Sequence, residues 1–480
     1  MNVNMHKSLE YHEHYDHYDL IVAGGGFAGV AAALAAARGG LRVLLIEKGN
    51  SLGGAAAACL VNPFMPYWTD AQTANGRERL YLSAGIFREI LDALSAAGAL
   101  GDDEMTFDEE CLKLLLNRMI ARAGVKTLFH SWLTGAEADG GRVTGVTVGN
   151  KTGLTRFNAD YYVDATGDAD LAVACGYPWR LGRAPDNLCQ PMTLCFRLAN
   201  VGMKAFEASR HTITPLYKEL QAQGKIKNIR EDVLIFRTLS DGILHFNSTR
   251  IVKKNPVDAF DVTDAEIDAR EQVFELYGFL KARVDGFQNS RLIMTAPQIG
   301  VRESRMIDGE YILTGEDLTA CVKFDDAIAA GNYDIDIHNP EGSGTSHYYF
   351  PEGAYYTIPY RCLIPKGGEN LLVAGRCVSA THEAQASIRI MPIVCCLGEA
   401  AGTAVSVAFN SGSEKNGNET GEARGNGTGG VEICDGGTCA DGMRGGGTNG
   451  GEARGSRLSV RDADVKAIQK LLRANGAFIG

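Results

Sequence analysis

The stretch Asp19-Leu-Ile-Val-Ala-Gly-Gly-Gly-Phe-Ala-Gly29 decides the fold class of this chain of 480 residues. Its first five residues form a short apolar run, which is typical of a buried parallel strand. Phe27 to Arg38 are rich in alanine and end at Gly39-Gly40, which predicts a helix with a glycine stop. Arg42-Val-Leu-Leu-Ile-Glu47 predicts a second buried strand. Strand, glycine turn, helix and strand together form one right-handed βαβ unit.

Gly24, Gly26 and Gly29 have the G-x-G-x-x-G spacing between this strand and this helix, which is the context of a dinucleotide-binding turn. Gly24 makes the turn, Gly26 lets the backbone approach a pyrophosphate, and Gly29 lets the helix pack on the strand. The pyrophosphate is expected at the helix N-terminus, beside Phe27, where unpaired N–H groups favour an anion. Glu47 ends the second strand and is placed to accept a hydrogen bond from a ribose 2′-hydroxyl. Its carboxylate would repel a 2′-phosphate, which disfavours NADP.

Two later strand-end turns, Ala165-Thr166-Gly167-Asp168 and Ala374-Gly-Arg376, indicate where more of a cofactor would lie. Gly53-Gly54, shortly after Glu47, would let a long cofactor approach the backbone. The carboxyl ends of parallel strands meet at one edge of a sheet, so these turns should converge on the first one. Such converging turns fit an extended flavin dinucleotide better than a single nicotinamide site.

The remaining patterns predict an α/β domain that is interrupted by an α+β unit. In the first part we expect a helix at 110–121, a strand at 125–129, a hairpin of 133–138 with 143–148, and a strand at 161–165. The interrupting unit should contain strands at 192–198, 242–247 and 357–362 and helices at 266–284 and 320–330. A buried strand at 370–375, a helix at 391–408 and a terminal helix at 462–473 complete the prediction.

The predicted fold class is therefore α/β, with a Rossmann-type (ββα) FAD-binding domain that is discontinuous in sequence and an inserted α+β substrate domain. Its expected parts are a disordered tail at 1–17, the first part of the FAD-binding domain at 18–174 with a small cap excursion at about 60–105, the substrate domain at 175–367, the second part of the FAD-binding domain at 368–410, a Gly-rich flexible loop at 411–456 and a C-terminal helix at 457–480.

Composition excludes several classes of partner. The net charge of −11 makes nucleic acid an unlikely partner, because the phosphate backbone needs a basic surface. No apolar run reaches the ~20 residues of a membrane span, and the longest, 394–409, is interrupted by Glu399. The 12 cysteines include no C-x-x-C pair, and Cys434 with Cys439 lacks the further ligands of a metal site, so no metal is expected. Without an apolar signal segment, the expected location is cytoplasmic.

The chain resembles the FAD-dependent oxidoreductase family related to the glutathione-reductase-2 type flavoproteins, whose distant relatives include succinate dehydrogenase and fumarate reductase flavoproteins. The segments that carry the resemblance are 24–29, 52–54, 164–170, 300–305, 358–361, 370–376, 379–384 and 387–392. The resemblance implies bound FAD. Residues 55–59 lack the histidine with which succinate dehydrogenases attach FAD, which implies a non-covalent flavin. The candidate FAD contacts are Gly24, Gly26, Phe27, Ala28, Gly29, Glu47, Lys48, Gly53, Gly54, Ala165, Thr166, Gly167, Asp168, Gly375, Arg376, Met391 and Pro392.

The resemblance also implies catalytic candidates. Met391-Pro392 opens the helix that in relatives points its positive end at the flavin, where it stabilises negative charge. His382 is the candidate acid–base group, with Glu383 beside it, although a purely structural histidine is the alternative. Arg389 and Arg302 are candidates to hold an anionic or polar substrate.

Two alternatives stay open for these candidates. Arg302, Glu303 and Arg305 could instead form a buried ion-pair network that supports the domain junction. If His382 is structural, the proton would come from Glu383, Tyr360 or water.

These features predict an FAD-dependent oxidoreductase that transfers a hydride between a small-molecule substrate and the flavin. The substrate could be anionic. Only one dinucleotide fingerprint is present, so no built-in NAD(P)H domain is expected. The identity of the electron acceptor or donor is therefore left open. The alternatives are a flavin-holding subunit that relays electrons within a redox complex and, less favoured by the charge, a tRNA-modifying flavoprotein.

Overall fold

The computed structural model describes residues 11–14, 16–73, 76–417 and 457–480. At its centre is a parallel sheet with the strand order β21-β10-β2-β3-β6. This sheet confirms the Rossmann-type α/β class, and β21 pairs with β10 although the two are far apart in sequence, so the domain is discontinuous. The strands are β2 (Tyr18–Ala23), β3 (Val43–Ile46), β6 (Lys126–Leu128), β10 (Ala159–Asp164) and β21 (Leu371–Val373).

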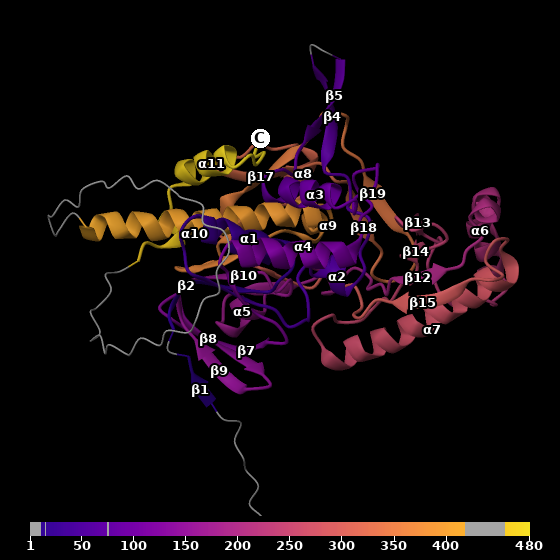
Figure 1. Ribbon diagram of the computed structural model, residues 1–480, viewed down its shortest axis with the longest axis horizontal. Helices are drawn as coiled ribbons and strands as arrows, with labels where there is room; N and C mark the ends of the chain where they lie inside the picture. The colour runs from indigo at the N-terminus through magenta and orange to yellow at the C-terminus, as the bar shows by residue number, and fades with distance from the viewer. Residues whose placement is uncertain (1–10, 15, 74–75, 418–456) are drawn as a thin grey trace, which may run out of the picture.

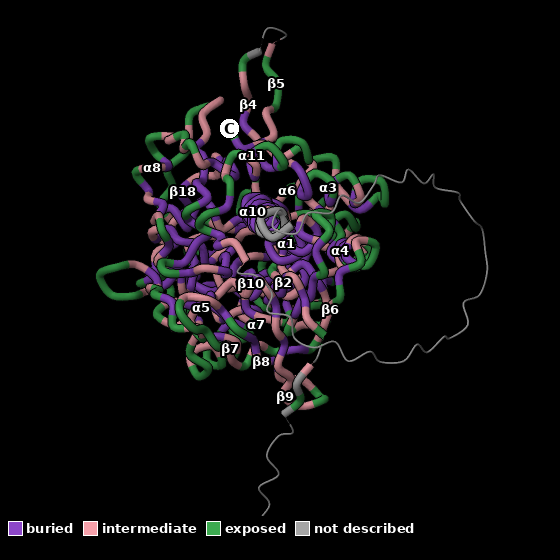
Figure 2. The backbone as a smooth tube through the Cα atoms, turned by 90° about the vertical axis from the view of Figure 1, so that its left-hand side faces the viewer, coloured by how far each residue is buried: buried purple, intermediate pink, exposed green. Residues whose placement is uncertain are grey.

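Helices α1 (Phe27–Arg38) and α10 (Met391–Gly417) lie side by side at the core (Figure 1). Two glycines of α10 permit this contact: a Cβ at Gly398 would lie 2.0 Å from the carbonyl oxygen of Ala28, and one at Gly402 would lie 2.2 Å from that of Ala32. Any side chain at either position would force the helices apart. Figure 2 shows both helices end-on within buried backbone.

One helix among the described residues is long and apolar enough to cross a membrane by length and composition, namely 391–411 of α10. Within the fold, 94% of its apolar window is buried. Packing against α1 therefore accounts for its composition, as for the core helix of a globular protein. On the same side of the sheet lie α3 (Ile86–Ala96) and α4 (Glu109–Arg122).

A small second sheet has the order β1-β9-β8-β7, built by β7 (Trp132–Asp139), β8 (Arg142–Asn150) and β9 (Gly153–Phe157). Its edge is β1 (Tyr11–Glu13), which runs parallel to β9. The predicted disordered tail at 1–17 is therefore wrong for these three residues. The edge of β9 offers backbone hydrogen-bond partners to β1, and no local sequence pattern reveals them. The ring centroids of His14 and Phe157 also lie 4.8 Å apart. Residues 1–10 lie outside the described part.

The inserted unit contains an antiparallel sheet with the order β13-β14-β12-β15 and two long helices, on the right of Figure 1. It has a hydrophobic cluster of its own, which includes Phe196, Phe246 and Leu276. Helix α6 contains Pro215, which interrupts the helical pattern and explains why the sequence analysis missed it. The elements are β12 (Phe196–Ala199), β13 (Ile235–Arg237), β14 (Leu244–Phe246), β15 (Arg291–Thr295), α6 (Met203–Ala222) and α7 (Ala259–Arg283).

The predicted helix at 320–330 is wrong. A short helix, α8 (Gly315–Thr319), ends before it, and β17 (Ala327–Gly331) then pairs antiparallel with β20 (Tyr356–Pro359). Thr314 and Asp317 form a capping box that starts α8, and Cys321 has a φ of 51° just after its end. The alanines of β17 are buried on both faces, so tertiary pairing overrides their helical preference.

The predicted Gly-rich loop at 411–456 begins too early, because α10 continues to Gly417; the rest of the segment, 418–456, lies outside the described residues. The cap excursion at about 60–105 contains α3 and a hairpin of β4 and β5, which projects at the top of Figure 1. The other elements are α2 (Ala55–Ala58), β4 (Trp68–Thr73), β5 (Gly76–Tyr81), α5 (Asp170–Ala174), β11 (Trp179–Leu181), β16 (Arg305–Ile307), β18 (Ile335–His338), β19 (Thr345–Tyr348), η1 (Tyr360–Leu363), α9 (His382–Ile388), η2 (Val460–Asp462) and α11 (Val465–Ala474).

Candidate functional site

The glycine turns that the sequence singled out meet at the carboxyl edge of the parallel sheet. The N–H of Gly53 donates to the carbonyl of Gly25 at 2.9 Å. A Cβ at Gly24, where φ is +102°, would lie 2.3 Å from the carbonyl oxygen of Ala165. Only glycine permits this approach between the turns after β2 and β10. A Cβ at Gly375, in the turn after β21, would lie 3.4 Å from the Cβ of Ala28.

The N-terminus of α1 is open to an anion. Its N-cap is Gly26, and no side chain caps it. A Cβ at Gly26 would meet nothing closer than the Cα of Gly54, at 3.8 Å. The start of the helix therefore lies close to the Gly53-Gly54 loop, with glycine on both sides. This arrangement fits a pyrophosphate, which would accept hydrogen bonds from the first N–H groups of the helix and gain from the helix dipole.

Glu47 joins this turn to the next loop. One carboxylate oxygen accepts from the N–H of Gly25 and the other from the N–H of Gly49, both at 2.6 Å. A carboxylate has acceptor capacity for further bonds, so ribose hydroxyls could still be bound. Lys48 is exposed, and its Nζ lies 5.4 Å from the ring centroid of Trp132.

Asp168 and Arg376 are engaged with each other. Asp168 accepts from Arg376 and, at 2.6 Å, from the hydroxyl of Ser304. Arg376 also donates to the carbonyls of Gly167 and Val301. These two predicted contacts thus tie together the turns after β10 and β21 and the segment before β16. Asp168 and Arg376 therefore fix the shape of the site by holding these turns in place.

Thr166 belongs to the same turn, and its N–H and hydroxyl both donate to the buried carboxylate of Asp164. The remaining predicted contacts are mixed in character. The ring of Phe27 is buried edge-on against Phe64 at 5.6 Å, so only its backbone borders the turn. Met391 and Pro392 are the first residues of α10, two positions after Arg389.

His382 is the first residue of α9, where the hydroxyl of Thr381 caps the helix. Its ring is buried, and Nδ1 lies 2.8 Å from Oε1 of Glu303. Because a carboxylate only accepts, Nδ1 carries the proton, which leaves Nε2 as the second functional nitrogen of the ring. Glu303 is fully buried, and its other oxygen accepts from the N–H of Gln190 at 2.9 Å.

Arg302 precedes Glu303 and has no carboxylate partner among the described residues. Its guanidinium donates to the carbonyl of Pro191 at 2.6 Å and to the side chains of Thr193 and Asn247. Burial lowers the pKa of Arg302, the positive charges of Arg230 and Arg389 add to this, and the pKa falls to about 9.

Arg389, at the other end of α9, has an ion-pair partner from another part of the sequence. Its guanidinium lies 3.7 Å from Asp336 of β18, and its Nε is buried without a hydrogen-bond partner. Asp336 also lies 3.3 Å from Nε2 of His338 and accepts from the hydroxyl of Tyr333. Burial acts to raise the pKa of Asp336, but His338, Arg389 and Arg302 outweigh it and hold that pKa below its usual range. Arg389 thus has an ionised carboxylate beside it, whereas Arg302 has none within ion-pair distance among the described residues.

Two candidates, Glu383 and Tyr360, are not part of this cluster. Glu383 is exposed and packs on the other side of α9, where a Cβ at Gly315 would lie 2.9 Å from its own Cβ. Tyr360 is buried, its hydroxyl donates to the carbonyl of Val460 at 2.8 Å, and burial raises its pKa, so it is not a proton source. The alternative network of Arg302, Glu303 and Arg305 is not formed, because Glu303 pairs with His382 and Arg305 with Asp170.

Sequence reasoning missed Asp336, His338 and Gln190. Gln190 connects the parts of the cluster, since its side chain contacts Gln385 and accepts from the N–H of His338. These residues belong to no local motif, and only the tertiary fold brings them to α9.

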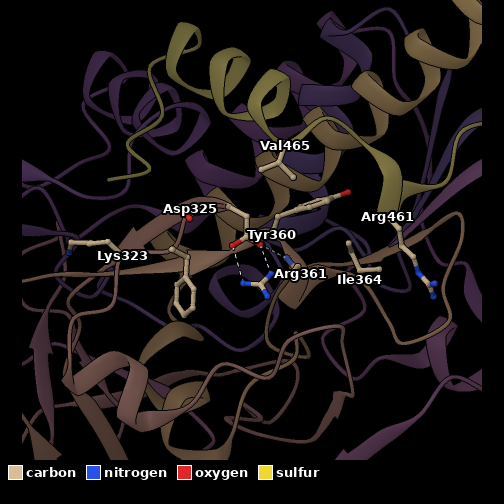
Figure 3. Close-up of a pocket in the computed structure, with 9 residues that line it drawn as sticks. Lys323, Asp325, Tyr360, Arg361, Ile364, Arg461 and Val465 are labelled. Carbon is tan, nitrogen blue, oxygen red and sulfur yellow. Dashed lines mark hydrogen bonds and ion pairs between the residues drawn. The ribbon is translucent and has the colours of Figure 1, made fainter.

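A surface hollow of about 560 Å³ lies elsewhere, between residues 323–326, η1 and α11 (Figure 3). Arg361, which lines it, forms an ion pair with Asp326. Apart from Tyr360, none of the catalytic or cofactor candidates lines this hollow. It is therefore distinct from the converging turns and from the cluster around α9.

The sheet, the uncapped glycine turn and the converging loops define a dinucleotide-binding α/β protein. A family model described as "FAD dependent oxidoreductase" matches residues 19–416, and the chain belongs to this family. It is accordingly an FAD-dependent oxidoreductase, and FAD is its cofactor.

Other comparisons are more limited. A stretch of 40 residues is 58% identical to vinyl phenol reductase of Lactiplantibacillus plantarum, and the match spans 8% of this chain and 8% of that protein. Among solved structures, a geranylgeranyl bacteriochlorophyll reductase-like protein of Thermoplasma acidophilum is 13% identical with a TM-score of 0.41, covering 84% of this chain and 80% of that one. A flavin-dependent brominase is 12% identical with a TM-score of 0.39, covering 82% and 79%.

Proposed function

We propose that the chain transfers a hydride between a small anionic molecule and non-covalently bound FAD. FAD, when bound, supplies the acceptor or donor of that hydride. The observation that carries the proposal is the arrangement at α9. His382 begins α9 and is held by Glu303, the residue after Arg302, which has no carboxylate partner among the described residues. Arg389 ends the same helix and lies 3.7 Å from Asp336.

The residues of this cluster have separate roles. Arg302 and Arg389 hold the anionic group of the substrate, because these two cations have one carboxylate, Asp336 beside Arg389, and an anion would balance the charge that is left. His382 exchanges a proton with the substrate at Nε2.

Two observations support a non-covalent flavin. Residues 55–59, which follow the Gly53-Gly54 loop, contain no histidine. The one thiol there, Cys59, contacts the carbonyl of Ile299, and burial raises its pKa to about 11. A neutral thiol with a raised pKa is a poor nucleophile for attachment to a flavin.

An anaerobic titration tests the proposal. The holoprotein is mixed with small carboxylates and with their neutral amides, and the visible absorbance of the flavin is followed. We expect carboxylates to bleach it, or to restore the colour of the dithionite-reduced protein, and amides to do neither. Bleaching by no anion, or equally by the amides, contradicts the proposal.

A variant of Arg302 locates the anion. Arg302→Gln should weaken the binding of an active carboxylate by roughly ten- to a hundredfold, since a hydrogen bond to a charged group is worth ~1.5–3 kcal/mol. Arg361→Gln, which removes the surface pair with Asp326, is the matched control and should bind normally. An unchanged dissociation constant in Arg302→Gln would place the anion elsewhere.

Arg230 and Arg250 are buried and paired with Asp232 and Glu231, so neither is at the surface, where the phosphates of a nucleic acid would need a cation. We therefore propose no nucleic-acid partner. The electron-relay role, the identity of the electron acceptor or donor and the cytoplasmic location stay predictions from the sequence.

A further inference from the structure

Glu303 is the buried acid whose purpose the sequence left open. Both of its oxygens are used: one accepts from Nδ1 of His382 at 2.8 Å and the other from the N–H of Gln190 at 2.9 Å. The carboxylate is fully buried, and the backbone of Gln190 holds it from a segment far from α9. His382 is therefore fixed in one orientation and one tautomer, with the proton on Nδ1.

This tautomer decides what His382 can do. A neutral imidazole with its proton on Nδ1 has a lone pair on Nε2, so Nε2 is an acceptor and a base. The Glu303 carboxylate also stabilises the imidazolium that forms when Nε2 takes a proton. His382 is thus prepared to remove a proton from a substrate, and the natural partner for Nε2 is an O–H or N–H donor.

The arginines restrict what else the substrate carries. Arg230 is paired with Asp232, and Arg250 with Glu231. Among the described residues, Arg389 lies 3.7 Å from Asp336 and Arg302 has only uncharged hydrogen-bond partners, which leaves one positive charge unpaired. One carboxylate balances that charge, whereas a second carboxylate would exceed it. An ammonium group would add a second positive charge to the same place, so a hydroxyl fits the donor role better than an amine.

We infer that the substrate is a monocarboxylic hydroxy acid, that the enzyme oxidises its alcohol to a carbonyl, and that Glu303 is the positioning residue for His382. This inference rests on the proposed function. The O–H proton goes to Nε2 of His382, and the hydrogen on the carbinol carbon leaves as a hydride for FAD. The alcohol loses two electrons and the cofactor gains them, so atoms and electrons balance.

The substrate class is tested first with the unmodified holoprotein. Glycolate, lactate and mandelate are compared with acetate, propionate and phenylacetate, and with glycine and alanine, by anaerobic bleaching of the flavin. We expect only hydroxy acids to bleach it. Bleaching by amino acids or by the deoxy acids would overturn the hydroxy-acid inference while leaving the anionic-substrate proposal intact, whereas no bleaching by any anion would overturn both.

Binding to the flavin-depleted protein gives a readout that is independent of turnover. By calorimetry, the hydroxy acid that bleaches best should bind roughly tenfold more tightly than its deoxy analogue, the effect of one added hydrogen bond. Equal dissociation constants would mean that no buried acceptor meets the hydroxyl, and would overturn the inference.

Variants test the role of Glu303. Glu303→Gln presents an N–H to Nδ1 and moves the proton to Nε2, so flavin reduction should slow roughly 10²–10⁴-fold. Its pH–rate profile should also lose the limb that reports the free base. Glu303→Asp, which keeps the carboxylate, should restore part of the rate and the limb. Glu383→Gln, a change of the same kind at the next residue after His382 but on the exposed side of α9, should behave as the parent.

A pH profile of Glu303→Gln that matches the parent would overturn the positioning role. So would a Glu303→Asp variant that is as slow as Glu303→Gln with the same flavin content. If Glu303→Gln fails to fold, the comparison of Glu303→Asp with the parent, together with the ligand series above, still decides the outcome.

Discussion

Glu47 shows how one carboxylate can serve the turn and the cofactor at once. Both of its oxygens accept backbone N–H groups, from Gly25 and Gly49, and so fix the shape of the turn before any ribose binds. Glu47→Gln keeps the size of the side chain but points an N–H donor at one of these N–H groups. FAD affinity should fall by roughly ten- to a hundredfold, the worth of a charge-assisted hydrogen bond.

The measurement is the dissociation constant of FAD from its fluorescence on titration of the flavin-free protein. Asp19→Asn is a suitable control, because Asp19 lies at the other end of β2, where its carboxylate accepts from the N–H of Arg42. An unaltered constant in Glu47→Gln would show that the ribose is bound elsewhere.

His382 and Glu383 form a matched pair for testing catalysis, since adjacent residues of one helix face different surroundings. His382→Ala should keep its flavin and reduce it roughly 10²–10⁴-fold more slowly, the usual effect of losing a positioned proton-transfer group. Glu383→Ala should reduce it at the parent rate, because that side chain is exposed beside α8. Stopped-flow absorbance with an active substrate measures both. A parent-like rate in His382→Ala would make the histidine structural.

At the residue scale, the sequence located the glycines and the candidates His382, Arg302 and Arg389, but not the polar residues that surround these candidates. Gly24 and Gly375 are recognisable because strand, glycine and helix follow one another within a few residues. Asp336 and Gln190 reach α9 from distant parts of the chain, and their neighbours in sequence carry no sign of this. Glu383 was misplaced because sequence proximity to His382 says nothing about the face of a helix on which a residue lies.

At the scale of elements, Glu399 explains how a charged residue is tolerated in the apolar helix α10. Its carboxylate accepts from the N–H of Ile86 at 3.0 Å and so caps α3, whose N-cap residue, Gly85, has no side chain to do so. A Cβ at Gly85 would lie 2.3 Å from this carboxylate. Burial raises the pKa of Glu399 to about 7, the nearby Glu89 adds to this, and the N–H of Ile86 opposes it.

This contact predicts a dependence of stability on pH. The pKa of Glu399 is higher in the folded state than the ordinary 4.5 of the unfolded chain, so the protonated form stabilises the fold. That contribution is fully present below about pH 4.5 and is lost as pH rises through about 7. The loss is on the order of 3 kcal/mol.

Glu399→Gln cannot titrate, so it should remove this part of the pH dependence while its amide oxygen still accepts from Ile86. Free energies of unfolding in urea at pH 5 and pH 8 measure the effect. Asp92→Asn, at an exposed site of α3, is the control and should leave the difference between the two pH values unchanged. The same difference in Glu399→Gln and the parent would contradict the raised pKa.

The elements that the sequence predicted well are those whose local pattern and tertiary surroundings agree. α1 and α4 have the expected bounds within about a residue, because glycine or a capping aspartate marks their ends. β17 was predicted as a helix, since its alanines suit a helix and only pairing with β20 makes them a strand. β1 was missed because its partner, β9, lies far along the chain.

At the scale of the whole molecule, the last described segment holds the fold together from a distance. The hydroxyl of Tyr161, on the central sheet, donates to the carbonyl of Leu458 at 2.7 Å, and that of Tyr360 donates to Val460 at 2.8 Å. The N–H of Val460 in turn donates to the carbonyl of Glu369. These contacts attach the segment to both parts of the sequence that build the sheet.

The segment also buries apolar surface. Ile468 and Leu472 of α11 and Val460 of η2 belong to the main hydrophobic cluster, beside α10 and β17. Each such side chain contributes ~1.5–3 kcal/mol. The Gly-rich segment 418–456 is different in composition: its large apolar residues are Val431, Ile433 and Met443, which cannot supply a core.

Two deletions should therefore have opposite results. Replacing 418–456 by a Gly/Ser linker of about 20 residues, with a root-mean-square span of roughly 25 Å, should leave the flavin content and the melting temperature nearly unchanged. Ending the chain at Gly417 should cost more than about 5 kcal/mol, because two buried hydroxyls lose their acceptors and an apolar face loses its cover. Such a loss is comparable to the whole stability of many proteins, so little folded product is expected.

Since an unfolded product cannot be analysed further, Tyr360→Phe provides a graded measurement. It leaves the carbonyl of Val460 without this donor and should lower the free energy of unfolding by ~1–3 kcal/mol. If the linker variant loses flavin, or the shortened chain melts like the parent, the roles of the two segments are the reverse of those argued.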